Sequence, residues 1–182
     1  MKRICITLAL FAALLLPGCG QNALESRWEG FSSAITAADT VGFTADIRAE
    51  YEDKSVEFTL ELAQSGDDTS VTVIFPEELR GVKAVSHGAK RELEYAGFVI
   101  DTGTLPGGLT PVGALPALVD AMCGGYADCF WREGECTVVR LIADDSLSVT
   151  LWLSEELVPV HAELESGGRV TVFCDIRDWR LS

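Results

Sequence analysis

The sequence has few of the residues on which enzyme catalysis most often depends. It contains two histidines, His87 and His161, and it lacks the G-x-S-x-G, H-E-x-x-H, P-loop and G-x-G-x-x-G motifs. The first histidine falls beside a predicted turn and the second on the polar face of a predicted strand. The adjacent carboxylates Asp67-Asp68 and Asp144-Asp145 fall in predicted turns, where Asp makes local hydrogen bonds and cannot flank a reacting bond. We therefore predict a protein that is not an enzyme and that has no cofactor and no metal.

Basic residues are also scarce. The chain has 14 Lys and Arg against 28 Asp and Glu, and its net charge is −14. A chain of this charge is repelled by nucleic acids and by anionic lipid surfaces, so we expect neither as a partner. Its acidity is typical of a well-solvated exterior, and recruitment of a basic partner is the alternative.

A long apolar run lies at the N-terminus, at residues 4–16, directly after Lys2 and Arg3. This run is short for a transmembrane span, and it ends in Leu16-Pro17-Gly18-Cys19, which resembles a bacterial lipobox. The resemblance implies that residues 1–18 are a signal peptide and that Cys19 is lipidated by acyl chains such as palmitate. The mature protein would then be anchored at the extracytoplasmic face of a bacterial cell membrane. An ordinary secretory signal with an incidental Cys19 is the alternative.

Removal of this signal leaves 164 residues with 12 basic and 28 acidic side chains, a net charge of −16. That length is sufficient for one domain with a hydrophobic core. Residues 19–22 would be the lipidated cysteine and a short tether. No repeat, composition shift or low-complexity linker divides residues 23–182, so we predict a single domain there.

Four further cysteines follow, namely Cys123, Cys129, Cys136 and Cys174. An even number in an exported chain suggests two disulfides, and three pairings are possible. We favour Cys123–Cys129, which closes a short loop, together with Cys136–Cys174, which would join two strands. Free thiols are one alternative, and a zinc site is a weaker one because the spacings do not match the usual C-x₂₋₄-C pattern.

Hydrophobic periodicity indicates both helices and strands. Apolar residues recur at helical spacing over 23–38, and then alternate with polar residues over 43–51 and 56–62, which predicts a hairpin. Further strands are predicted around 71–75, 80–86 and 90–101. A Gly/Pro loop at 102–110 precedes Thr110-Pro111, which is a typical helix start. Pro116 should kink that helix or delay its start. The final predicted strands are 136–143, 147–153, 158–165 and 169–177.

This order of elements predicts a mainly β fold of the α+β class. Short connections and one-sided alternation indicate an antiparallel sheet with one polar face. A sheet of nine or ten strands tends to curl, and helices are needed to cover its apolar side. We therefore expect a curved sheet that forms an incomplete barrel, with the N-terminal helix and the central helix and loop over its concave face.

Five stretches resemble the LolA/LolB-like half-barrel superfamily of bacterial envelope lipoproteins, and its lipidated members in particular. They are the helix up to Asp39, VGFTADIRAEY (41–51), VEFTLELAQS (56–65), FVIDTGTLPGGLTPVGALPALVDAM (98–122) and LWLSEELVPVHAEL (151–164). The resemblance implies a hydrophobic cavity that receives lipid or acyl chains. The four cysteines depart from the family's general pattern, and the carrier-type Arg that gates lipid entry has no counterpart in this sequence.

Inward apolar side chains of the predicted strands and central helix are the candidate ligand-binding residues. They are Phe43, Ile47, Phe58, Leu60, Val73, Phe75, Leu115, Met122, Val149, Leu151, Val160 and Val172. The segment 102–122 is the candidate lid of such a cavity. The alternative is that these residues form a filled core, because a sequence does not report voids. The protein would then be a non-catalytic envelope sensor or scaffold that binds a protein partner.

Overall fold

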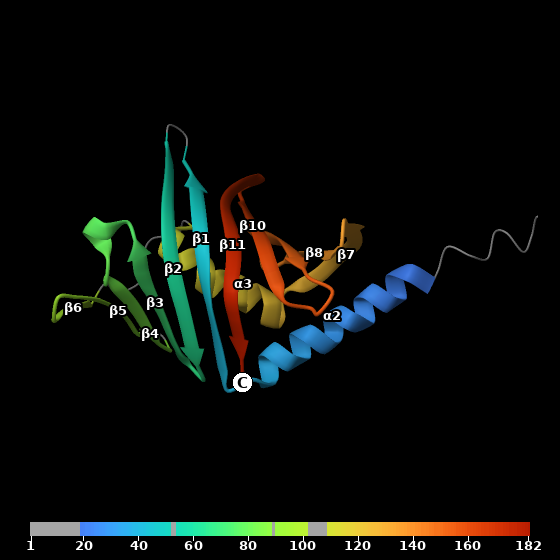
Figure 1. The fold of residues 1–182 in the computed structure, drawn as a ribbon, viewed down its shortest axis with the longest axis horizontal. Coiled ribbons are helices and arrows are strands. Elements are labelled where there is room, and N and C mark those ends of the chain that lie inside the picture. Colours follow the sequence, from blue (N-terminus) through green and yellow to red (C-terminus); the bar gives the residue numbers. More distant parts are fainter. Residues whose placement is uncertain (1–18, 52–53, 89, 102–108) are drawn as a thin grey trace, which may run out of the picture.

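The computed structural model describes residues 19–51, 54–88, 90–101 and 109–182. The predicted signal peptide and most of the predicted loop at 102–110 lie outside these residues. The described chain forms one antiparallel sheet of 11 strands in the order β6-β5-β4-β3-β2-β1-β11-β10-β9-β8-β7, with two α-helices (Figure 1). Within the described part of the chain, no helix combines the length and apolar character needed to span a membrane.

The first half of the chain contains the N-terminal helix and six strands. Helix α2 (Cys19–Ala37) begins four residues before the predicted start at 23 and so includes the expected tether. The strands are β1 (Thr40–Glu50), β2 (Ser55–Ser65), β3 (Asp68–Phe75), β4 (Lys83–His87), β5 (Lys90–Tyr95) and β6 (Phe98–Asp101), with a 3₁₀ turn at Glu77–Leu79. Each strand pairs with the next, which confirms the predicted hairpins.

The second half begins with helix α3 (Pro111–Gly124), which starts at the predicted Thr110-Pro111. Pro116 lies inside this helix and does not delay its start. Five strands follow, namely β7 (Tyr126–Glu133), β8 (Cys136–Ile142), β9 (Leu147–Leu153), β10 (Pro159–Ser166) and β11 (Arg169–Leu181). Strand β7 was not predicted, although its aromatic residues Tyr126, Phe130 and Trp131 favour a strand.

The two halves join where β11 pairs with β1, from Val41–Leu181 to Ala49–Val172. This pairing places the last strand in the middle of the sheet, and β6 and β7 form its edges. The sheet is therefore unclosed, and it curves around α3 as predicted (Figure 1).

The core lies on the concave side of the sheet. Helix α3 packs against strands from both halves, and α2 packs on α3 and β7 (Figure 1). On α2, Trp28, Phe31 and Ile35 are buried, which confirms the predicted apolar stripe. An aromatic chain continues from Phe31 to Trp179 and on to Phe43, with centroid distances of 6.3 and 5.4 Å, and ties the helix to the central strands.

Candidate functional site

The concave face consists of apolar side chains and is filled. Among the described residues of the core, Thr137 is the only buried polar or charged side chain, and 30 hydrophobic residues are buried. From α3, Leu115, Leu118 and Met122 are all 0% exposed and occupy the space between the helix and the sheet. The face that was predicted to line a cavity is therefore closed by α3 in this structure.

Most candidate ligand-binding residues come together on this face. Buried side chains are those of Phe43, Ile47, Leu60, Val73, Leu115, Met122, Val149, Leu151 and Val172. Phe58 and Val160 are half-buried, and Val160 lies beside an irregularity in the β9–β10 pairing.

Phe75 is the exception. It was predicted to face the cavity, but in the structure it lies on the outer face of the sheet. Val73 pairs with Leu60, but Phe75 pairs with Thr59, so Ile74 is an extra residue in the β2–β3 ladder. Such a bulge reverses the side-chain alternation beyond it. Phe75 therefore lies on the outer face with Thr59, and 51% of its surface is exposed.

Helix α3 is held differently at its two ends. At its N-terminus the Thr110 hydroxyl accepts a hydrogen bond from the Gly113 backbone N–H, at 3.1 Å. Pro116 has no N–H to donate to the carbonyl four residues earlier, and Gly113 also weakens the first turn. An isolated helix of this length and composition is unstable in water. Its stability therefore comes from packing on the concave face.

The C-terminal end of α3 is tied to α2. Ser32 donates a hydrogen bond to the Met122 carbonyl at 2.9 Å. Burial raises the pKa of the Cys123 thiol, a side-chain hydrogen bond with Thr36 lowers it by less, and the charge of Asp120 raises it slightly. The arrangement gives α3 a fixed C-terminal end beside a Gly- and Pro-containing N-terminal end.

The four cysteines are free thiols in this structure, so neither predicted disulfide is present. Two strands, β9 and β10, separate Cys136 on β8 from Cys174 on β11. Three strand spacings amount to about 14 Å, whereas a disulfide needs Cα atoms within about 7 Å.

The thiols differ in their surroundings. Cys123 packs against the core, whereas Cys129 is exposed on β7. Burial, with a smaller effect from Asp175, raises the pKa of Cys174 to about 12.

A groove of about 500 Å³ lies on the outer face of the sheet, where none was predicted. Its lining includes Asp46, Arg48, Glu57, Phe75, His161 and Phe173. These residues occupy the polar positions of β1, β2, β10 and β11, together with the displaced end of β3. Phe173 and Trp152 are aromatic residues at outward-facing positions of their strands, where polar residues are usual. These aromatic residues are the sequence signal that could have indicated the groove.

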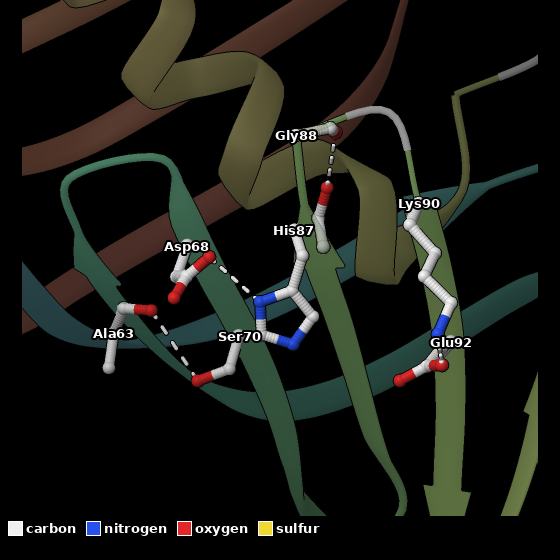
Figure 2. Close-up of polar contacts among 8 residues, drawn as sticks. Ala63, Asp68, Ser70, His87, Gly88, Lys90 and Glu92 are labelled. Atoms are coloured by element: carbon white, nitrogen blue, oxygen red, sulfur yellow. Dashed lines mark hydrogen bonds and ion pairs between the residues drawn. The ribbon is translucent and has the colours of Figure 1, made fainter.

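A second groove, of about 480 Å³, lies toward the opposite ends of β1–β4. Figure 2 shows the side of this groove formed by β3 and β4, where His87 Nδ1 is 2.7 Å from an Asp68 carboxylate oxygen. In the same view Ser70 bonds to the Ala63 carbonyl, and Lys90 pairs with Glu92 on β5. His87 and Lys90 therefore each lie against a carboxylate, and Lys83 on β4 also lines the groove.

The histidines and the turn carboxylate Asp144 make local contacts. His161 is half-buried, lies 2.7 Å from Asp175 and packs edge-on against Trp152. His87 is exposed. Asp144 accepts hydrogen bonds from the Ser146 and Leu147 backbone N–H groups, which lower its pKa and stabilise the β8–β9 turn. In the part of the chain that the structure describes, no group of three His, Cys, Asp or Glu residues could hold a metal ion.

Comparison with known proteins gives matches in fold but none in sequence. No protein-family profile matches the sequence, and no curated protein matches it significantly. The crystal structure of an uncharacterized conserved protein from Thermus thermophilus matches with a TM-score of 0.51 and 8% identity, over 85% of this chain and 86% of that one. A LolA superfamily protein from Nitrosomonas europaea gives a TM-score of 0.49 at 13% identity, over 87% and 93% of the two chains. The Mycobacterium tuberculosis lipoprotein LppX gives 0.47 at 11% identity, over 87% and 95%.

The match to the Thermus thermophilus protein, with a TM-score above 0.5, supports this fold. An unclosed antiparallel sheet wraps a central helix, and an N-terminal helix packs beside that helix, as the sequence resemblance implied. At these identities the likeness concerns the fold alone.

Proposed function

We propose that this protein is a membrane-anchored, extracytoplasmic lipoprotein that binds lipid or acyl chains on its concave face and catalyses no reaction. The observation that supports it is the apolar concave face, which is covered by a helix with a weak N-terminal end. Movement of α3 about its C-terminal attachment to α2 would open a long apolar surface. The ligand's hydrocarbon would then replace the side chains of α3.

The free-energy cost of exposing the α3 side chains and the gain from burying an acyl chain are of similar size. Burial of each large apolar side chain contributes about 1.5–3 kcal/mol. For Leu115, Leu118 and Met122 together, exposure would therefore cost about 5–9 kcal/mol. Transfer of a 16-carbon chain into an apolar site contributes about 0.8 kcal/mol per methylene, or about 12 kcal/mol. Long acyl chains can therefore displace α3, whereas short ones cannot.

Native mass spectrometry tests this proposal. Residues 19–182 carrying Cys19→Ser would be exported behind a cleavable signal and analysed without detergent. Adducts with phospholipid or acylglycerol masses that disappear on denaturation are the expected result. A single ligand-free mass would contradict the acyl-binding role.

The anchor has a test of its own. Cys19 lipidation predicts that labelled palmitate enters the wild-type protein and the Cys129→Ser variant but not Cys19→Ser. Membrane attachment should follow the same pattern, because more than one acyl chain is needed for stable anchoring. Equal labelling of wild type and Cys19→Ser would contradict this assignment.

A second candidate function is a sensor or scaffold that binds an envelope protein and never opens. The filled concave face favours it, because Leu115, Leu118 and Met122 leave no exposed surface there. Leu115→Trp separates the two functions. An openable site accepts the larger side chain with little loss of stability, whereas a fixed core is overpacked and loses about 1–3 kcal/mol.

A further inference from the structure

The groove on the outer face lies across the sheet from the proposed lipid site, and Ile47 and Phe58 are candidate lipid-site residues that also contribute to its lining. A row of paired residues crosses it, from Phe75 on β3 through Thr59 and Asp46 to Asp175 and His161 on β10. Five strands have four spacings, or about 19 Å. An extended peptide rises about 3.3 Å per residue, so this row has the length of about six residues.

Carboxylates dominate the charge of this groove. Asp46 forms an ion pair with Arg177, and Asp175 lies against His161. Glu57 is exposed and has no ion-pair partner among the residues that the structure describes, because the nearby Arg48 pairs with Glu50 at 2.9 Å. An approaching cation would therefore find Glu57 available without breaking an ion pair.

Aromatic rings lie beside these carboxylates. Phe75 is half exposed at the β3 side of the groove. The Arg48 guanidinium lies 4.2 Å from the centroid of the Phe173 ring, so this surface already holds one cation against an aromatic face. An exposed aromatic residue beside an unpaired carboxylate is complementary to a segment that carries both apolar and basic side chains.

We propose that the outer groove docks an extended segment of a basic partner protein. An apolar side chain of the partner packs on Phe75, and a Lys or Arg pairs with Glu57. Charge complementarity selects this occupant. The chain carries a net charge of −14, which opposes anionic membranes, acidic segments and a second copy of itself.

Peptide binding to the full lipidated chain in phosphatidylcholine nanodiscs tests this assignment. The probes are fluorescent hexapeptides of sequence KFKFKF, KSKSKS and EFEFEF, with empty nanodiscs as the background. We expect KFKFKF to bind most tightly, and KSKSKS and EFEFEF to bind at least tenfold more weakly. Binding of KFKFKF should also weaken as salt rises.

Two variants and two controls locate the binding. Phe75→Ala and Glu57→Gln should each weaken KFKFKF binding at least fivefold, and both side chains are exposed, so the fold is retained. Tyr126→Ala and Glu133→Gln remove an exposed aromatic ring and an exposed carboxylate from the edge strand β7 and should change nothing. Absent binding, equal losses in all four variants, or self-association that only Phe75→Ala abolishes would each overturn the proposal.

Discussion

Truncation of Leu118 should have opposite effects on stability and on acyl-chain affinity. This side chain is 0% exposed and lies on the face of α3 that packs against the sheet. Leu→Ala substitutions in cores cost about 2–5 kcal/mol of unfolding free energy. If α3 must leave the sheet before a ligand enters, the lost packing no longer opposes entry. A reduction of about 2 kcal/mol in the opening free energy tightens binding up to about 30-fold.

The assay combines urea unfolding with a titration of cis-parinaric acid, a fluorescent 18-carbon fatty acid. Leu118→Ala should unfold at lower urea and bind the probe more tightly than the wild type. Ile35→Ala is the matched control, because Ile35 is also buried, at 2% exposed, but lies on α2. It should lose similar stability without a gain in affinity.

The length dependence of binding gives an internal check. Each methylene contributes about 0.8 kcal/mol, so affinity should rise about fourfold per carbon along a series of fatty acids. If Leu118→Ala loses stability and leaves the affinity for cis-parinaric acid unchanged, α3 is a fixed part of the core. The proposed opening of α3 would then be refuted, and the scaffold function would remain.

Three further predictions concern the thiols, a turn and the aromatic chain. In the native protein, maleimide should label Cys129 rapidly, whereas Cys174 should react only after unfolding because burial keeps its thiol protonated. Asp144→Asn should lower the melting temperature at neutral pH but not under strongly acidic conditions. The folded pKa of Asp144 is lowered by its hydrogen bonds, so its contribution to stability is present above the pKa of the unfolded chain and is lost as the pH falls through the folded pKa. Asp145→Asn, in the same turn, is the control. Trp179→Ala should cost about 3 kcal/mol in urea unfolding, because its ring connects α2 to β1; an unchanged midpoint would contradict that role.

Much of the fold could be predicted because its signals are local. Alternation over 43–51 and 56–62 specified which side chains face the core, and the observed burial of Phe43, Ile47 and Leu60 confirms it. The Thr110-Pro111 start of α3 is a local capping signal in the same sense. Strand β7 was missed because its core contacts, from Ala127 and Phe130, are separated by a bulge and do not alternate strictly.

The misplaced residues depend on pairing between strands. An extra residue at Ile74 moves Phe75 to the outer face, and only the register with β2 reveals it. The predicted Cys136–Cys174 disulfide was wrong for a similar reason. The spacing of cysteines along a chain does not report that two other strands lie between them in the sheet.

The sequence by itself determined the kind of protein: an acidic chain with a lipobox-like N-terminus, two-residue alternation and no catalytic motif. Periodicity and turn residues act over a few positions, so they are legible without a structure. Only the tertiary structure decided that α3 fills the concave face and that a groove of carboxylates and aromatic rings crosses the outer one. Filled and empty space arise from side chains that meet from distant parts of the chain, and no local pattern records whether they meet.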